Sequence, residues 1–75
     1  MNTTTFADAL FAATVREAAA FSRAARDAVT PDASRAPHAE AAIRCLWLAA
    51  AAHRRGDSEM GALWNDCADF HRRYA

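Results

Sequence analysis

The chain contains no lysine, and its nine arginines are balanced by nine aspartates and glutamates, so the formal net charge is zero. Non-specific nucleic-acid binding requires positive charge that nothing in the protein compensates. A polybasic membrane anchor requires the same excess. The charge balance therefore weighs against both. The lysine-free, alanine- and arginine-heavy composition is typical of GC-rich coding sequence of a bacterial or phage-like kind.

Glycine is also scarce, since Gly56 and Gly61 are the only two. The chain therefore has no glycine-rich loop that could cradle a phosphate group. None of its serines lies in a nucleophile-elbow context. A chain of 75 residues also has little room for a deep catalytic cleft. We therefore expect a protein that is not an enzyme, has no catalytic residues and binds no cofactor.

Long apolar runs are missing as well. No stretch of 18 apolar residues is present, so no membrane span is expected. The first residues lack a basic segment and are soon followed by Asp8 and Glu17, a pattern unlike that of a signal peptide. These features predict a cytoplasmic protein. Two cysteines in such a chain are expected to be free thiols.

Alanine dominates what is present, and β-branched residues are few. Alanine has the best intrinsic helix propensity, so this composition predicts an all-α fold. We expect a three-helix bundle in which a long first helix packs on an antiparallel hairpin of the second and third. Thr5 can cap the first helix, and Pro37 suits the first turn of the second. The expected single domain comprises residues 1–75, with helices at about 6–29, 37–55 and 58–74 and a connector over 30–36.

Few large side chains are available for the core. We expect a set of twelve to pack against alanine surfaces: Phe6, Leu10, Phe11, Val15, Phe21, Ile43, Leu46, Trp47, Leu48, Leu63, Trp64 and Phe70. Glu17 falls on the apolar side of the first helix, where it is expected to reach solvent at the edge of that face or to pair with an arginine of another helix. A functional carboxylate is the alternative. In the third helix, Cys67 and His71 share the apolar face.

The stretch HRRGD, residues 53–57, contains an Arg-Gly-Asp tripeptide. Cations at the end of one helix complement its dipole, Gly56 suits a left-handed C-cap, and Asp57 suits the N-cap of the next helix. We therefore interpret the tripeptide as two helix ends that meet, not as an adhesion ligand.

Cys45 and Cys67 lie at equal distances on either side of Gly56, so an antiparallel hairpin can place them opposite each other. With His71 they form a weak candidate for a zinc site, in which His38 or a water would have to supply the fourth ligand. Packing in the core is the favoured interpretation of both cysteines, with a disulfide or another redox role as the alternative.

Trp47 falls within the charged arc of the second helix. An aromatic side chain surrounded by arginine is typical of binding hot spots, whereas packing of Trp47 under the first helix is the alternative. The predicted partner-binding residues are Glu40, Ile43, Arg44, Trp47 and Arg54. The expected function is a non-enzymatic protein that binds another protein or a second copy of itself. Adaptors, chaperones and small inhibitors of larger machines fit this description, including anti-defence inhibitors encoded by mobile elements.

Two other functions remain open. The first is a nucleic-acid-binding module that uses Arg16, Arg23 and Arg26 on the polar side of the first helix. The second is a metal- or thiol-dependent protein that uses Cys67 and His71. Salt dependence separates the first from protein binding, because nucleic-acid binding weakens steeply as salt rises.

Overall fold

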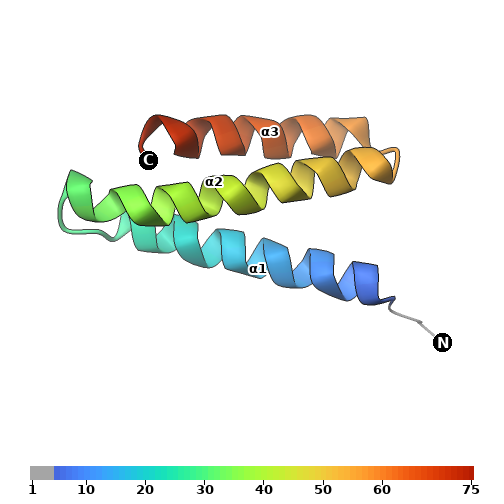
Figure 1. Ribbon diagram of the computed structural model, residues 1–75, viewed down its shortest axis with the longest axis horizontal. Coiled ribbons are helices and arrows are strands. Elements are labelled where there is room, and N and C mark those ends of the chain that lie inside the picture. Colours follow the sequence, from blue (N-terminus) through green and yellow to red (C-terminus); the bar gives the residue numbers. More distant parts are fainter. Residues whose placement is uncertain (1–4) are drawn as a thin grey trace.

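The computed structural model describes residues 5–75, which form three α-helices and no strand. They are α1 (Phe6–Arg26), α2 (Pro31–Arg54) and α3 (Ser58–Arg73). Each helix runs antiparallel to the one before it, as Figure 1 shows. The predicted all-α three-helix bundle is therefore confirmed.

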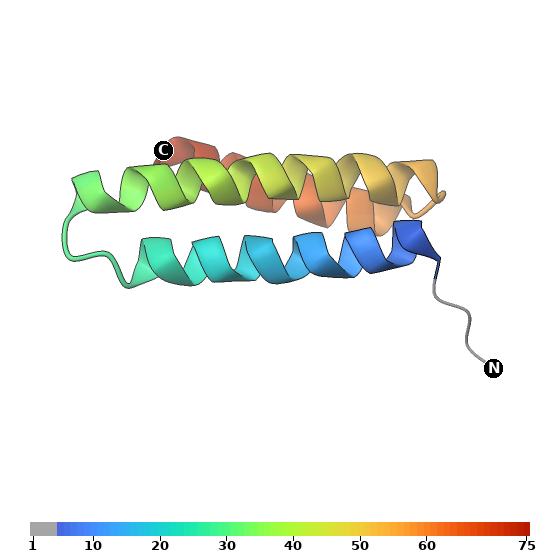
Figure 2. The same cartoon turned by 60° about the horizontal axis from the view of Figure 1, so that its bottom comes forward.

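The central element of the bundle is α2. Both α1 and α3 pack along it, and the two views in Figures 1 and 2 show the three helices in this arrangement. Within the described residues, the backbones of α1 and α3 do not approach each other closely. These two helices meet through side chains, and the bundle is open on the side between them.

The first helix begins where the sequence predicts. The hydroxyl of Thr5 accepts a hydrogen bond from the backbone N–H of Asp8 (3.1 Å), as an N-cap should. The helix ends at Arg26, three residues before the predicted end. The backbone N–H of Asp27 turns back to the carbonyls of Arg23 and Ala25, which closes the last turn.

The second helix begins six residues earlier than predicted, so the expected connector over 30–36 is wrong. Thr30 has an extended backbone (φ −135°, ψ 156°), and its side chain accepts a hydrogen bond from Ala33 N–H. Pro31 then occupies the first turn, where its missing N–H leaves no bond unmade. Pro37 lies inside α2. The sequence offers two prolines suited to a first turn, and the helix starts at the earlier one.

The α2–α3 turn confirms the interpretation of Arg-Gly-Asp as two helix ends. Gly56 has a φ of +81°, in the left-handed region that glycine tolerates. The carboxylate of Asp57 accepts a hydrogen bond from Met60 N–H (3.1 Å) and caps α3. Both residues therefore serve local chain geometry.

The fully buried core consists mostly of small side chains, so the predicted set of twelve large core residues is confirmed only in part. Leu48 is the one large side chain that is fully buried among the described residues, and its buried neighbours are Ala18, Cys45 and Ala68. Phe11, Val15, Trp47 and Trp64 pack against this cluster and are partly buried. Six of the twelve expected core residues are instead exposed: Phe6, Leu10, Ile43, Leu46, Leu63 and Phe70.

The physical reason is the close approach that alanine allows. Alanine at a helix contact brings the two backbones together, so a large side chain on the margin of that contact stays outside. Because α1 and α3 each pack closely on α2 alone, part of the apolar stripe on each of them is left uncovered. None of the three helices, within residues 5–75, is both long and apolar enough to cross a membrane.

Candidate functional site

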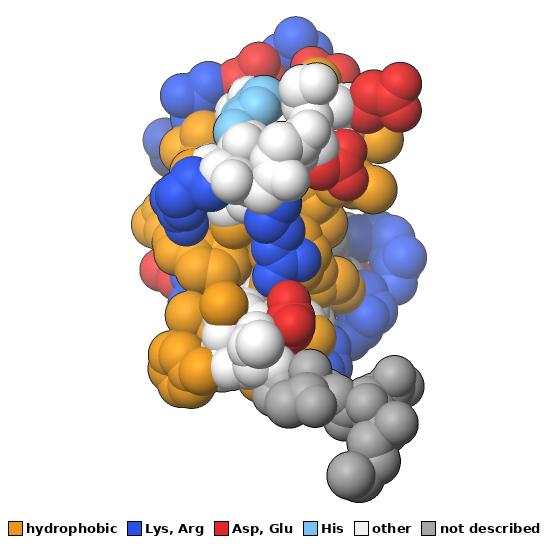
Figure 3. All heavy atoms as spheres, turned by 90° about the vertical axis from the view of Figure 1, so that its right-hand side faces the viewer, with side chains coloured by type: hydrophobic (Ala, Val, Ile, Leu, Met, Phe, Trp, Pro, Cys, Tyr) orange, Lys and Arg blue, Asp and Glu red, His pale blue; other side chains and the backbone are white. Residues whose placement is uncertain are grey.

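Exposed or partly buried apolar side chains lie at the start of α1 and along one stripe of α2 that runs from its middle to its end. We call this surface the α1–α2 face. It comprises Phe6 and Leu10 of α1 and, at helical spacing on α2, Ile43, Trp47 and Arg54. A shallow cavity of about 320 Å³ lies within it. The cavity is lined by Phe6, Ala7, Leu10, Trp47, Ala51, Arg54 and Arg55. In the end-on view of Figure 3, hydrophobic side chains are exposed in this region.

Trp47 is the centre of this face. Its ring packs at a tilt against Phe11, with 6.4 Å between the centroids, and it is half-buried. Packing of Trp47 against the first helix is therefore confirmed, although Trp47 also lines the cavity. Its role in partner binding stays a prediction. Ile43 lies one helical turn earlier and is 59% exposed. Phe6 is 83% exposed on the neighbouring helix.

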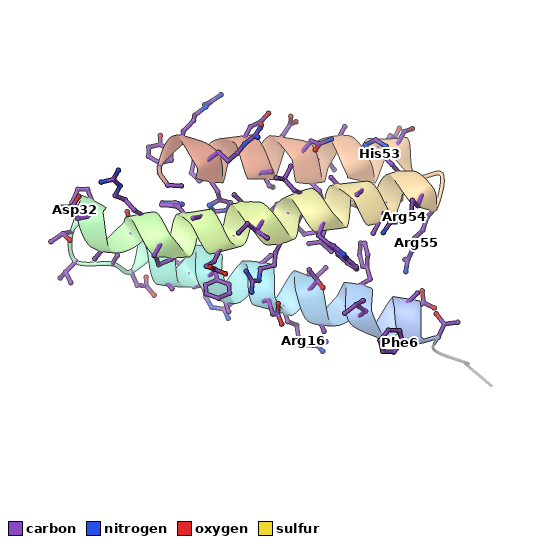
Figure 4. The ribbon with its side chains drawn as sticks, viewed as in Figure 1. Phe6, Arg16, Asp32, His53, Arg54 and Arg55 are labelled. Atoms are coloured by element: carbon purple, nitrogen blue, oxygen red, sulfur yellow. The ribbon has the colours of Figure 1, made fainter. Side chains whose placement is uncertain are left out.

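Two arginines lie at the edge of the face, one in an ion pair and one without. Arg55 extends from the end of α2 toward α1, as Figure 4 shows, and forms an ion pair with Asp8 (2.8 Å) while lying over the ring of Phe11. Arg54 is exposed and forms no ion pair within residues 5–75. Its guanidinium remains available for a carboxylate of a partner.

Arg44 and Glu40 do not belong to this surface, although the sequence placed them there. Arg44 forms ion pairs with Glu40 and with Glu17 of α1 (3.1 Å to the latter). Its guanidinium also lies 4.5 Å from the centre of the Phe21 ring. The expected pairing of Glu17 with another helix is thereby confirmed. Arg44 therefore links α2 to α1. Of the five predicted partner-binding residues, Ile43, Trp47 and Arg54 belong to the α1–α2 face.

The zinc candidate is not assembled. Cys45 is buried and Cys67 is exposed, and both are free thiols. The expectation that both cysteines pack in the core is therefore wrong for Cys67. Burial raises the pKa of the Cys45 thiol to about 11, with a smaller contribution from Cys67, so Cys45 stays protonated at neutral pH. Among residues 5–75, no three metal-binding side chains come together.

The predicted nucleic-acid-binding arginines of α1 are all exposed, but they divide into two groups. Arg23 and Arg26 line a second cavity, on the open side between α1 and α3. Arg16 lies nearer the start of α1 (Figure 4) and is not part of that lining. Arg26 is also paired with Asp27 (3.3 Å). The structure therefore does not present the three as a single free basic strip.

A chain of polar side chains links all three helices at this second cavity. Ser22 Oγ of α1 is hydrogen-bonded to Nε2 of His71 in α3 (3.1 Å). The Nδ1 atoms of His71 and His38 share a hydrogen bond of 2.9 Å. His71 is 8% exposed. Its pKa is lowered from the ordinary value, mainly because burial disfavours the charged imidazole and also because His38 can carry charge nearby.

Sequence reasoning considered His38 only as a possible fourth ligand of the zinc candidate and did not place it beside His71. A signal for that position was available, because the reflection about Gly56 that sets Cys45 opposite Cys67 also sets His38 opposite Tyr74, three residues after His71.

Stability is expected to fall as the pH drops from about 7.5 to 5. The unfolded chain takes up a proton at its ordinary pKa, whereas the folded chain resists protonation of His71. The stabilising contribution is therefore complete above the unfolded value and is lost as the pH falls through the folded one. Thermal melts followed by circular dichroism test this. His71→Gln should flatten the dependence, and exposed His53→Gln should leave it unchanged. A wild-type melting temperature that does not change over this range would contradict the expectation.

No protein-family model, curated protein or solved structure matches the chain.

Proposed function

We propose that the protein acts in the cytoplasm by binding another protein through the α1–α2 face, as an adaptor, chaperone or inhibitor of a larger assembly. The observation that carries this proposal is the position of the large apolar side chains. The chain buries alanine, leaves Phe6 and Ile43 exposed and buries Trp47 only in part. Exposing contiguous apolar surface is unfavourable in water, and such surfaces mark interaction sites.

The chemistry of the face defines the partner that would fit. Interface cores are enriched in aromatic residues and arginine and depleted in lysine. Trp47 supplies an aromatic ring that Phe11 already holds in place, so little side-chain entropy is lost on binding. Arg54 supplies a guanidinium that is not neutralised by an ion pair within the described residues. A partner with an apolar patch and a carboxylate at its edge matches this arrangement.

Ile43→Asp is expected to weaken the complex by about 30-fold or more, the loss typical of a hot-spot residue. Leu63→Asp is the matched control, because Leu63 is 58% exposed on α3 and Ile43 is 59% exposed on α2. The partner is isolated from host extract on the immobilised wild-type protein, purified, and titrated against both variants. Sedimentation equilibrium of the protein alone tests whether the partner is a second copy. Equal loss in both variants would contradict the proposal.

The same titrations distinguish nucleic-acid binding. A protein interface anchored by Trp47 should change little between low and physiological salt. A steep decline with salt, together with loss of binding in Arg16→Gln/Arg23→Gln and retention in Ile43→Asp, would replace the proposal with the nucleic-acid alternative.

A further inference from the structure

The open side of the bundle contains a cavity of about 540 Å³ between the C-terminal halves of α1 and α3. We call it the α1–α3 cavity, and all three helices contribute to it. Its lining residues are Ser22, Arg23, Arg26, His38, Phe70, His71 and Tyr74. Its volume lies within the range of small-molecule sites. The α1–α2 face shares none of these residues, so the two surfaces are distinct.

The charge of this lining differs from that of the whole chain. The protein has as many acidic as basic residues, yet the cavity is lined by two arginines and two histidines and by no carboxylate. Asp27 pairs with Arg26 (3.3 Å) but is not part of the lining. Arg23 forms no ion pair within residues 5–75. The cavity therefore concentrates hydrogen-bond donors and positive charge.

The other walls are aromatic. The rings of Phe70 and Tyr74 lie 5.2 Å apart, and His38 packs against both, at 6.2 Å and 5.5 Å. Phe70 and Tyr74 are each about half exposed. Aromatic rings favour a planar apolar body in an offset or edge-on arrangement. A ligand that covered them would remove apolar surface from water.

The polar floor of the cavity is already organised. His71 is held between Ser22 and His38, so its ring cannot turn freely. Adding one proton to His71 leaves both of its hydrogen bonds in place, because a charged imidazole can donate to Ser22 Oγ and to His38 Nδ1. Within the described residues, Nε2 of His38 makes no hydrogen bond. It can therefore be directed at a ligand.

We propose that the α1–α3 cavity binds a small organic anion, with an aromatic body against Phe70 and Tyr74 and a carboxylate- or sulfonate-like group against Arg23 and Arg26. Burial lowers the pKa of His71 in the free protein, and a bound anion would offset the cost of charging this imidazole. Anion binding and protonation of His71 should therefore favour each other. The titratable and charged groups that line the cavity are Arg23 and Arg26 of α1, His38 of α2, and His71 and Tyr74 of α3.

The probe is 8-anilinonaphthalene-1-sulfonate, an aromatic sulfonate whose fluorescence rises in apolar surroundings, and N-phenyl-1-naphthylamine is its uncharged counterpart. Wild-type protein should bind one sulfonate probe per chain, at least about tenfold more tightly than the neutral one. Arg23→Gln/Arg26→Gln should remove this preference and leave the neutral probe unaffected. Arg16→Gln/Arg35→Gln, two exposed arginines outside the cavity, should retain it.

Two further measurements test where the sulfonate probe binds and whether protonation of the protein strengthens its binding. Ile43→Asp should not change the affinity for the sulfonate probe, because it alters the other surface. The sulfonate stays charged between pH 8 and 6, so tighter binding at pH 6 reports on the protein. His38→Gln should weaken that dependence, and His53→Gln should not. Equal affinity for both probes, wild-type affinity in Arg23→Gln/Arg26→Gln, or loss of the signal in Ile43→Asp would overturn the proposal. Circular dichroism confirms that each variant is folded.

Discussion

Leu48→Ala is expected to remove a large share of the free energy of unfolding at 25 °C. Leu48 has no exposed surface and is the one large side chain in the centre of the core. Removing it takes away buried apolar contacts and leaves a cavity among alanines that cannot close around it, which typically reduces the free energy of unfolding by about 2–5 kcal/mol. A domain of this size has roughly 3–5 kcal/mol in total. Urea denaturation followed by circular dichroism measures the loss.

Leu46→Ala is the control for this prediction. Leu46 lies in the same helix, two residues away, but is 41% exposed. The same chemical change there should lower the free energy of unfolding by less than about 1 kcal/mol, because much of the side chain is already in water. Equal effects of the two substitutions would mean that Leu48 does not hold the core together.

Ala68→Leu is expected to lower the free energy of unfolding strongly, though less than Leu48→Ala does. Ala68 is fully buried in α3 beside Leu48, and its small size allows α3 to lie close to α2. A leucine side chain cannot fit there unless the helices separate, and overpacking of this kind costs about 1–3 kcal/mol or more. The midpoint of urea denaturation should fall accordingly.

Ala62→Leu is the matched substitution on the exposed side of α3. Alanine and leucine have similar helix propensities, so its free energy of unfolding should stay within about 0.5 kcal/mol of the wild-type value. A wild-type denaturation midpoint for Ala68→Leu would show that the α2–α3 contact has room for larger side chains.

Local signals in the sequence were sufficient for the number of helices and for the N-caps of α1 and α3, but not for that of α2. Thr5, Gly56 and Asp57 each act through groups within a few residues along the chain, so their roles follow from chemistry that sequence alone reveals. An arginine of another helix was one of the two expected positions of the Glu17 carboxylate, but Arg44 was not predicted as its partner. The sequence placed Arg44 on the partner-binding surface, because periodicity does not show which neighbouring helix a side chain faces.

Coverage of a helix face could not be predicted in the same way. Periodicity shows which side of a helix is apolar, but not whether a neighbouring helix lies over it. Phe6, Leu63 and Phe70 lie on apolar stripes and are nevertheless exposed, because α1 and α3 have no close backbone contact. The apolar residues of the α1–α2 face, and Phe70 in the α1–α3 cavity, are therefore residues that were expected to lie in the core.

The arrangement of the helices also bears on how the chain folds. Each backbone contact between helices joins neighbours in sequence, α1 with α2 and α2 with α3. The turns between them are short, from Asp27 to Thr30 and from Arg55 to Asp57. Little loop-closure entropy is lost before such contacts form, and proteins with local contacts fold in microseconds to milliseconds. Either helix pair can form first on α2, so the chain has two short routes to its native state.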